Sequence, residues 1–419
     1  MKIFPCRLSD GRRLPVLFRL IPSQPVLVPF LFVVLKRQYR AFNTIRNDLV
    51  AIKAFYEFHS LQNIDVDETL INGQLSLLMK NLEQFIAWLS IEKKAKNIVG
   101  RIGNKKLGHH YGIDPITRDG YLRSLKLFFT WCAQRYINTD APKTDLENSF
   151  SSSLSSIASR FDSHLVTPVT RQVNFRSLCD IEIAAIRELS HPSCALNPFR
   201  KQNRLRNWLI IETFIETGIR IGELLILTTS SVNKGKNHYY VSVINRPDAG
   251  EDTRAKAPSL KTNKSQRTIG ISESLYDRIQ QYVIHERRPR RNNLPMKLKH
   301  GYLWVSERGK PLALNSVASM FSRIVTAIQS KNPDLLKSAS PHSFRHTFAE
   351  RFLEYLIEVK DFDMERAKDE LRTICGWSDA SSMPQYYARR YIHNMANLHN
   401  KDRVETAWKR LSEALPSFN

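Results

Sequence analysis

The chain has 419 residues, of which 42% are hydrophobic and 25% charged, and this ordinary globular composition excludes wholesale disorder and a collagen-like fibre. Its 63 Lys and Arg residues outnumber its 40 Asp and Glu residues, so the formal net charge is +23. The five cysteines are scattered and form no CxxC motif, which excludes a disulfide scaffold and a structural zinc site and favours a cytoplasmic protein.

The positive charge recurs along the whole chain and is not confined to one tail. Lys and Arg clusters neutralise the phosphates of a nucleic acid and release its counterions, which is the main sequence-independent source of affinity. We therefore expect the partner to be an elongated polyanion, a nucleic acid. The basic segments are Lys36–Arg40, Lys93–Lys106, Arg200–Arg206, Arg254–Arg267 and Arg287–Lys299.

Residues 1–40 contain the longest apolar run, from Val26 to Leu35, which is interrupted by Pro29. A membrane-spanning helix needs about 20 apolar residues, so this run is too short to span. No signal-peptide cleavage site follows it. We predict that residues 1–40 form an N-terminal extension in which the run is a buried strand, and that no membrane is involved.

Residues 41–165 are predicted to form an all-α domain. Ile45, Leu49 and Ile52 recur at helical spacing, and similar patterns return up to residue 137. The serine-rich stretch Asn148–Ser159 is typical of a linker, and a short polar helix is the alternative. The first domain is therefore expected to end near residue 165.

Residues 166–419 are predicted to form a mixed α/β domain that is mainly helical and has a small antiparallel sheet. Apolar and polar residues alternate at Tyr239–Ile244 and Arg267–Ile271, as in strands. A helix is predicted from Pro341 to Tyr355, because Ser340 can cap it and proline suits its first position. Further helices are expected at Asp180–Leu189, Leu205–Glu216 and Met364–Ile374.

Two short motifs carry candidate anion-binding side chains. Gly218 is predicted to end a helix, and Arg220 follows it two residues later and precedes Glu223 by three residues. An arginine grips two oxygens of one phosphate well, although an exposed ion pair is the alternative. His342 and Arg345 lie three residues apart at a helix start, so both project from one side, near backbone N–H groups that favour an anion.

Two aromatic motifs follow. Trp377, after Gly376, has an indole N–H that can only donate, although a core position is the alternative. Tyr386 and Tyr387 precede two arginines, and a phenol near cations ionises more easily and can act as a nucleophile. Consecutive helical residues point about 100° apart, so only one of the two tyrosines can face a site.

Taken in order, these motifs resemble the tyrosine recombinase (phage integrase) family. That family's pattern is Arg-x-x-Glu, a lysine on a hairpin turn, His-x-x-Arg, Gly-His or Gly-Trp, and a tyrosine. The resemblance covers roughly residues 174–395, and it implies that residues 41–165 are the core-binding (SAM-like) DNA-binding domain and residues 166–419 the catalytic domain. The matching residues are Arg220, Glu223, Lys261, His342, Arg345, Gly376, Trp377 and one of the two tyrosines.

The resemblance implies a site-specific DNA recombinase or integrase that cleaves and rejoins strands through a covalent 3′-phosphotyrosyl intermediate, serving a mobile genetic element. Arg220 and Arg345 would hold the phosphate oxygens, and His342 would position the tyrosine or accept its proton. Trp377 would donate to a phosphate oxygen, and Glu223 would orient neighbouring basic groups. The scheme needs no cofactor and no metal, because side chains are the cations and the ester conserves bond energy.

The family pattern leaves two positions open. The spacing from Trp377 allows either Tyr386 or Tyr387 as the nucleophile, and the context Met-x-x-x-Tyr-Ala-Arg favours Tyr387. The general acid for the departing 5′ oxygen is Lys261 or Lys264. Lys261 is preferred because the family's lysine usually precedes the hairpin turn.

The implied partners are double-stranded DNA, other protomers in a synaptic tetramer, and an accessory directionality factor. Four arginines, Arg287, Arg288, Arg290 and Arg291, are predicted to contact the DNA backbone, with a solvated loop as the alternative. A stripe on the last helix is predicted to pack on a neighbouring protomer, with docking on its own domain as the alternative; its residues are Val404, Trp408, Leu411 and Leu415.

Two other functions are compatible with the same sequence. A non-catalytic DNA-binding protein could retain the fold, and a type IB topoisomerase-like resolvase would use the same nucleophile without strand exchange. A mere binder has no reason to assemble the full set of catalytic side chains, which favours the recombinase.

Overall fold

The structure is a computed structural model, and its described residues form two compact units, Met1–Gln172 and Val173–Asn419. The second unit carries all of the motifs singled out above. The described residues are 1–9, 13–90, 112–137, 154–166, 176–245, 252–254, 258, 260, 265–288, 290–291, 294–295 and 297–413.

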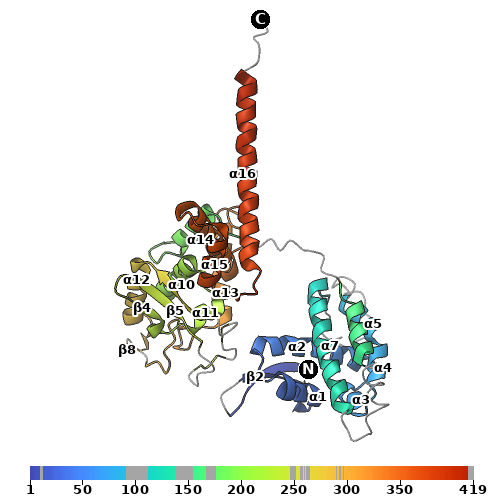
Figure 1. The fold of residues 1–419 in the computed structure, drawn as a ribbon. Coiled ribbons are helices and arrows are strands. Elements are labelled where there is room, and N and C mark those ends of the chain that lie inside the picture. The colour runs from blue at the N-terminus through green and yellow to red at the C-terminus, as the bar shows by residue number, and fades with distance from the viewer. Residues whose placement is uncertain are drawn as a thin grey trace. The chain divides into compact units, whose positions relative to one another are not determined.

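The first unit combines a three-stranded antiparallel sheet with helices (Figure 1). The strands are β1 (Lys2–Arg7), β2 (Arg13–Leu20) and β3 (Ser23–Pro25), with β2 in the centre. The helices are α1 (Leu27–Phe32), a π-helical turn (Val33–Arg37), α2 (Phe42–Leu61), α3 (Val66–Ile71), α4 (Leu75–Lys80), α5 (Leu82–Ser90), α7 (Pro115–Ile137) and a helix at residues 154–163.

The apolar run Val26–Leu35 is helical, so the predicted strand is wrong. Val28 and Phe32 are buried whereas Leu31 is exposed, which is the periodicity of a helix with one face in the core. Pro29 lies in the first turn of α1, where a missing N–H costs no hydrogen bond. A short apolar run alone does not distinguish a strand from a helix.

Residues 1–40 also share one hydrophobic core with the helices that follow and are not a separate extension. The ring centroid of Phe32 lies 5.3 Å from that of Phe128 on α7. The predicted linker is likewise helical over residues 154–163, and Ile157 and Phe161 are buried in the same core. These two side chains are four residues apart, so they lie on one face of a helix and give it a surface to bury.

The second unit contains a three-stranded antiparallel sheet with helices around it (Figure 1). Its strands are β4 (Val232–Lys234), β5 (Tyr239–Val243) and β6 (Arg267–Ile271), with β5 in the centre, and a small hairpin pairs β7 (Arg290–Arg291) with β8 (Leu294–Pro295). The helices are α9 (Asp180–Ser190), α10 (Arg204–Thr217), α11 (Ile221–Ile226), α12 (Glu273–His285), α13 (Leu314–Gln329), α14 (Pro341–Glu354), a π-helical turn (Tyr355–Val359), α15 (Met364–Cys375) and α16 (Met383–Glu413). The predicted fold class, mainly helical with small antiparallel sheets, is confirmed.

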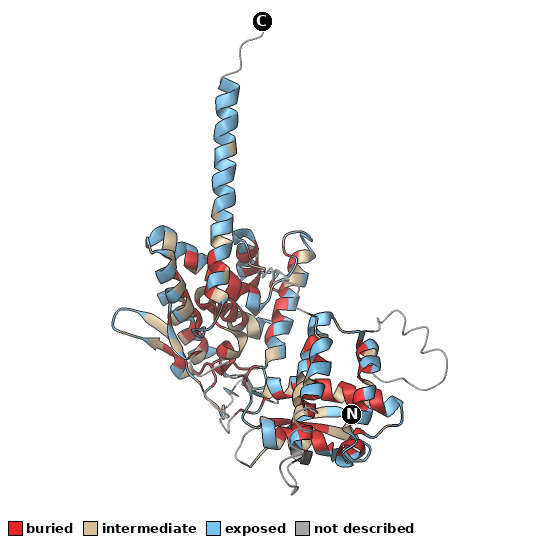
Figure 2. Cartoon of the chain, turned by 45° about the vertical axis from the view of Figure 1, so that its right-hand side comes forward, coloured by how far each residue is buried: buried red, intermediate tan, exposed pale blue. Residues whose placement is uncertain are grey.

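Helix α10 lies in the core of the second unit and is buried on nearly all sides (Figure 2). Phe214 on α10 packs beside Phe321 and Phe344, whose ring centroids are 6.0 and 6.5 Å away. A smaller apolar cluster joins α14, α15 and the first turns of α16, and it includes Leu353, Leu371 and Tyr387. This second cluster fixes the base of α16 against the rest of the unit.

A buried ion pair anchors the connection between β5 and β6. Asp252 and Arg254 are 2% and 7% exposed, and the carboxylate accepts from both Nε and Nη2 of the guanidinium. Nη1 of Arg254 donates to the carbonyls of Leu225 (2.9 Å) and Leu312 (3.1 Å). The guanidinium carbon also lies 4.5 Å from the ring centroid of Tyr302. This pair therefore ties the connection to three other segments of the unit.

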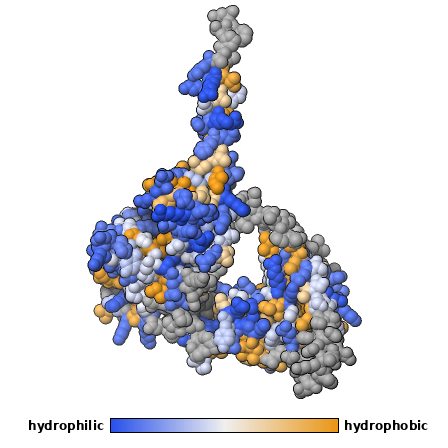
Figure 3. All heavy atoms as spheres, viewed as in Figure 1, coloured by the Kyte–Doolittle hydropathy of each residue, from blue (hydrophilic) through white to orange (hydrophobic). Residues whose placement is uncertain are grey.

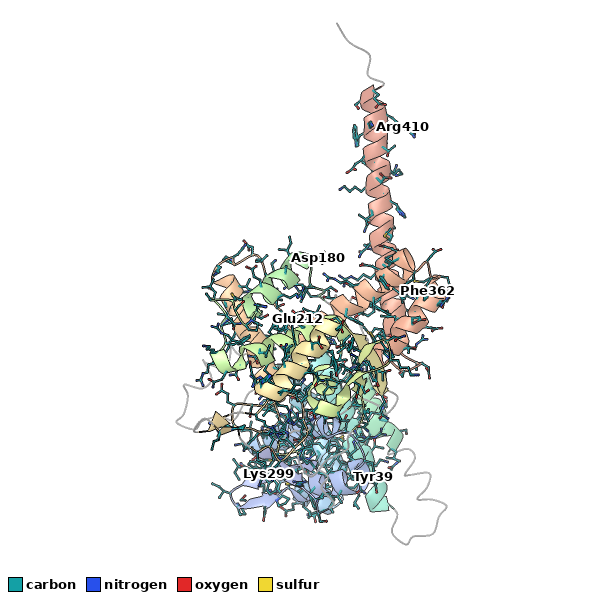
Figure 4. The ribbon with its side chains drawn as sticks, turned by 90° about the vertical axis from the view of Figure 1, so that its left-hand side faces the viewer. Tyr39, Asp180, Glu212, Lys299, Phe362 and Arg410 are labelled. Carbon is teal, nitrogen blue, oxygen red and sulfur yellow. The ribbon has the colours of Figure 1, made fainter. Side chains whose placement is uncertain are left out.

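Helix α16 has 31 residues and projects away from its unit (Figure 1). Beyond its base it is exposed in Figure 2, and Figure 3 shows hydrophobic side chains interspersed among hydrophilic ones along its length. Arg410 lies near its far end, whereas Phe362 lies beside its base (Figure 4). At 1.5 Å per residue the helix is about 46 Å long.

Candidate active site

The turn between α10 and α11 brings Gly218 against α14. Gly218 has φ +54°, and a Cβ on it would lie 2.4 Å from Cδ1 of Phe348. Only glycine adopts this left-handed conformation without cost, and only glycine leaves room for the phenylalanine. The carbonyl of Gly218 accepts a hydrogen bond of 2.8 Å from Nη1 of Arg345 on α14. The hydrogen bond from the Arg345 side chain to the Gly218 carbonyl thus joins the Arg-x-x-Glu turn to the His-x-x-Arg helix.

Glu223 holds two guanidinium groups at this turn. Its Oε1 accepts from Nη1 of Arg220 (2.6 Å), and its Oε2 accepts from Nη2 of Arg267 (2.9 Å). The side chain is 1% exposed. Burial alone would raise the pKa of Glu223, but Arg267 and Arg220 hold it below its ordinary value. Glu223 is therefore a carboxylate that forms hydrogen bonds with both guanidinium groups.

Arg267 was not singled out from the sequence, yet it connects three parts of the site. Besides Glu223, it donates from Nε to the carbonyl of Ile374 (2.6 Å) and from Nη1 to that of Ser265 (2.9 Å). A Cβ on Gly376 would lie 2.7 Å from its Nη1. The available signal was an arginine at the first position of a predicted strand, three residues after Lys264.

Helix α14 presents the next two candidates. Ser340 caps it by accepting from the backbone N–H of Ser343, and Pro341 occupies its first position, as predicted. His342 is exposed, whereas Arg345 is 3% exposed and donates from Nη2 to the carbonyl of Cys375 (2.6 Å). Burial, then Arg345 and Arg220, lowers the pKa of His342, so its ring is neutral at physiological pH.

Arg345, Trp377 and Tyr387 form a stack. The guanidinium carbon of Arg345 lies 5.3 Å from the ring centroid of Trp377. The rings of Trp377 and Tyr387 are 5.7 Å apart between centroids and 13° from parallel. Tyr387 is 1% exposed, and burial raises the pKa of its hydroxyl well above the ordinary value. Tyr386 is only partly buried, and its ring meets the edge of Tyr387 at 83°.

The hydroxyl of Tyr387 forms a hydrogen bond with Nδ1 of His346, one residue after Arg345. Sequence reasoning left His346 as a structural histidine. Its only signal was its place directly after the His-x-x-Arg motif, because 41 residues separate it from Tyr387.

Lys261 and Lys264 lie outside the described residues. Ser265, which follows them, is buried, and its hydroxyl lies 3.4 Å from the carbonyl of Gly376, next to Trp377. The contacts given above join Arg220, Glu223, Arg345, Trp377 and Tyr387. His342 is connected to Tyr387 through His346, with 4.4 Å between the centroids of the two imidazole rings.

The four arginines predicted to contact DNA are in different environments. Arg287 is 7% exposed and donates to the carbonyls of Tyr302 and His300, so its donors serve the fold and the predicted phosphate contact does not fit it. A buried guanidinium needs such partners. Arg288 is exposed. The backbones of Arg290 and Arg291 form β7, and their side chains lie outside the described residues.

Within the described residues, no group of three or more His, Cys, Asp and Glu side chains could hold a metal ion. Over the same residues, no helix is long and apolar enough to cross a membrane.

Known proteins with similar sequences include a transposase and a tyrosine recombinase. The family model described as the phage integrase family matches residues 186–393. Transposase A from transposon Tn554 of Staphylococcus aureus is 23% identical over 320 residues, which cover 74% of this chain and 75% of the transposase. Tyrosine recombinase XerD of Halalkalibacterium halodurans is 27% identical over 150 residues, which cover 36% of this chain and 41% of that protein.

Solved structures of recombinases also align with the chain. The XerH site-specific recombinase bound to palindromic difH substrate aligns at a TM-score of 0.49 and 15% identity, covering 86% of this chain and 80% of that one. The Tn1549 transposon integrase in complex with circular intermediate DNA aligns at a TM-score of 0.45 and 16% identity, covering 82% of this chain and 99% of that one. On its motifs and the match of residues 186–393 to the family model, the chain belongs to the phage integrase family, the tyrosine-type site-specific recombinases.

Proposed function

We propose that this chain breaks and rejoins DNA strands at specific sites through a 3′-phosphotyrosyl intermediate in which Tyr387 is the nucleophile. The observation that carries the proposal is the stack of Tyr387 on Trp377 and of Trp377 on Arg345. It places the phenol one indole ring away from a guanidinium that suits a phosphate. The ring of Tyr386, one position away on α16, meets the edge of the Tyr387 ring at 83°.

In the proposed reaction, the oxygen of Tyr387 attacks the scissile phosphorus and its proton passes to His342, whose lowered pKa leaves its ring neutral and able to accept. A bond forms between that oxygen and phosphorus, and the bond from phosphorus to the 5′ oxygen breaks. The 5′ oxygen takes a proton from Lys261, or from Lys264 if the family position is shifted. Attack by the 5′-hydroxyl of another strand reverses these steps and releases the tyrosine, so no external energy source is consumed.

Arg220 and Arg345 would neutralise the charge that develops on the non-bridging oxygens. A guanidinium has five N–H donors, so Arg345 can hold the carbonyls of Gly218 and Cys375 and still donate to a phosphate. Because these contacts fix its orientation in advance, it needs little reorganisation during the reaction. Trp377 would add its indole N–H, and Glu223 would keep Arg220 in place.

The net charge of +23 supports double-stranded DNA as the substrate. The names of the relatives, a transposase and a transposon integrase among them, support service to a mobile genetic element. The first unit would be the core-binding DNA-binding domain, and the exposed Arg288 would contact the DNA backbone. An accessory directionality factor remains part of this proposal.

The far part of α16 would contact a neighbouring protomer in a synaptic tetramer. Trp408 and Leu411 are 68% and 59% exposed on it, and large exposed apolar side chains on one stripe are typical of interaction surfaces. Leu415 of the predicted stripe lies outside the described residues. Deleting residues 400–419 should abolish synapsis but leave binding of a single site, and normal synapsis would contradict this assignment.

A nicked suicide duplex tests the first step, because the short cleaved strand diffuses away and traps the covalent adduct. Wild type should form a protein–DNA adduct, Tyr387→Phe should form none, and Tyr386→Phe should form the normal amount. Loss of the adduct in Tyr386→Phe alone would move the nucleophile by one residue and keep the mechanism. Absence of any adduct with bound wild type would indicate a DNA-binding protein without the activity.

A further inference from the structure

His346 makes the contact with Tyr387 that sequence reasoning gave to His342. It lies one turn after His342 on α14, is 2% exposed, and forms a hydrogen bond through Nδ1 with the hydroxyl of Tyr387. His342 is exposed at the helix start, and its ring packs on that of His346 with 4.4 Å between centroids. The buried histidine is therefore the one placed against the phenol.

Both partners of this hydrogen bond are uncharged. Burial, followed by His342, Arg345 and Arg390, lowers the pKa of His346 to about 3, so the ring is neutral at physiological pH. Burial raises the pKa of Tyr387, so the phenol keeps its proton. A neutral imidazole with its proton on Nε2 accepts at Nδ1, and the hydroxyl of Tyr387 is then the donor.

Tyr387 is held at two places. One face of its ring packs on Trp377, with the planes 13° apart, and stacking of this kind still allows the ring to slide. The hydrogen bond at the hydroxyl removes that freedom, because it fixes the position of the oxygen itself. Both contacts come from outside α16, so His346 on α14 and Trp377 in the segment after α15 together set where the nucleophilic oxygen lies.

We propose that His346 is a positioning residue for the nucleophile: its Nδ1 holds the hydroxyl of Tyr387 in one orientation, so that the oxygen enters the attack already directed. This inference rests on the proposed function, because it requires Tyr387 to be the nucleophile. It assigns no proton transfer to His346.

Three substitutions at one position separate orientation from packing. His346→Leu removes the acceptor. His346→Asn places its Oδ1 where Nδ1 lies, whereas His346→Gln places its amide where Nε2 lies and should not replace the contact. A displacement of about 1 Å costs about 10²-fold in rate, so His346→Leu and His346→Gln should slow single-turnover cleavage of the nicked duplex about 10–100-fold. His346→Asn should stay within about threefold of wild type.

The dissociation constant for the same duplex should change by less than about twofold in all three variants, because the hydrogen bond holds a protein group and not the DNA. The matched control is His300→Leu in the same unit, where Nε2 of His300 contacts the carbonyl of Gly309 (3.1 Å). This variant should cleave at the wild-type rate. Thermal unfolding of each full-length variant accompanies the kinetics.

Wild-type cleavage by His346→Leu would overturn the inference, as would an equal loss in His346→Asn and His346→Gln. If His346→Leu does not fold, the comparison of Asn with Gln decides alone. Failure of the proposed function looks different: wild type then forms no adduct, or Tyr387→Phe still forms one, and either result also overturns the role of His346.

Discussion

The Asp252–Arg254 pair allows a stability prediction that does not depend on the reaction. Arg254→Met removes the guanidinium but introduces a side chain of about the same volume as arginine. The carboxylate of Asp252 is then buried without its cation. The carbonyls of Leu225 and Leu312 lose their shared donor at the same time. Both charged side chains are nearly inaccessible, at 5% and 2%, so solvent cannot replace the lost partner.

Breaking a buried pair by removing one partner costs about 3–5 kcal/mol. For a unit of this size, 1 kcal/mol corresponds to about 2–4 °C, so the Tm should fall by about 6–20 °C. Urea unfolding of the full-length chain measures the free energy. Replacing both groups, as in Asp252→Leu with Arg254→Met, should recover most of the loss, because apolar side chains of similar volume can substitute for a buried pair.

The matched control is Arg200→Met, which removes the same group from the exposed pair of Arg200 with Glu307. Their side chains are 72% and 36% exposed, so this change should cost less than about 1 kcal/mol. The reasoning is refuted if Arg254→Met costs as little as Arg200→Met.

Three further predictions concern the site and its surroundings. Arg345→Lys should slow adduct formation about 10²–10³-fold in a single-turnover assay, because an ammonium cannot hold two carbonyls and a phosphate in one plane; a loss below about tenfold would argue against its role. Gly218→Ala should lower the free energy of urea unfolding by more than about 1 kcal/mol, since its φ is +54° and the new Cβ would meet Phe348; an unchanged midpoint would contradict this. The pKa of His346 is lowered to about 3, so above its ordinary value of 6.5 both states are neutral, and below it the unfolded chain binds a proton that the folded chain does not. Stability should therefore fall as the pH drops from about 6.5 towards 3, with a shallower slope in His346→Asn; parallel curves would show that His346 does not contribute.

The sequence predicts best where local signals agree. At α14, a capping serine, a proline at the first position and an apolar face all indicate the same helix start, and the helix begins at Pro341 as expected. At Val26–Leu35 an apolar run without visible periodicity led to the prediction of a strand, but the segment forms a helix. The difference is made by the tertiary core, which buries Phe32 against Phe128 and leaves Leu31 in solvent.

The candidate site also divides into residues that local motifs single out and contacts that only tertiary packing creates. Residue types in motif order identify Arg220, Arg345 and Trp377, because each motif is local. The contact of His346 with Tyr387 exists only after α14 and α16 pack together, so no spacing within either segment predicts it. Arg287 fails for the related reason that charge alone does not tell whether folding buries a guanidinium beneath backbone carbonyls.

Helix α16 carries Tyr387, the proposed nucleophile, in its second turn and continues without a break to Glu413, so most of the helix lies beyond that residue. The base is fixed by the pairing of Arg390 with Glu350 (2.7 Å). The arm beyond Tyr387 is about 39 Å long, so pulling its tip sideways by about 7 Å tilts the helix by about 10°. A hydroxyl about 8 Å from the helix axis then shifts by more than about 1 Å, a displacement of the size that changes reaction rates a hundredfold. A sideways force on the far end of the helix would therefore move the proposed nucleophile by a distance that matters for its reactivity.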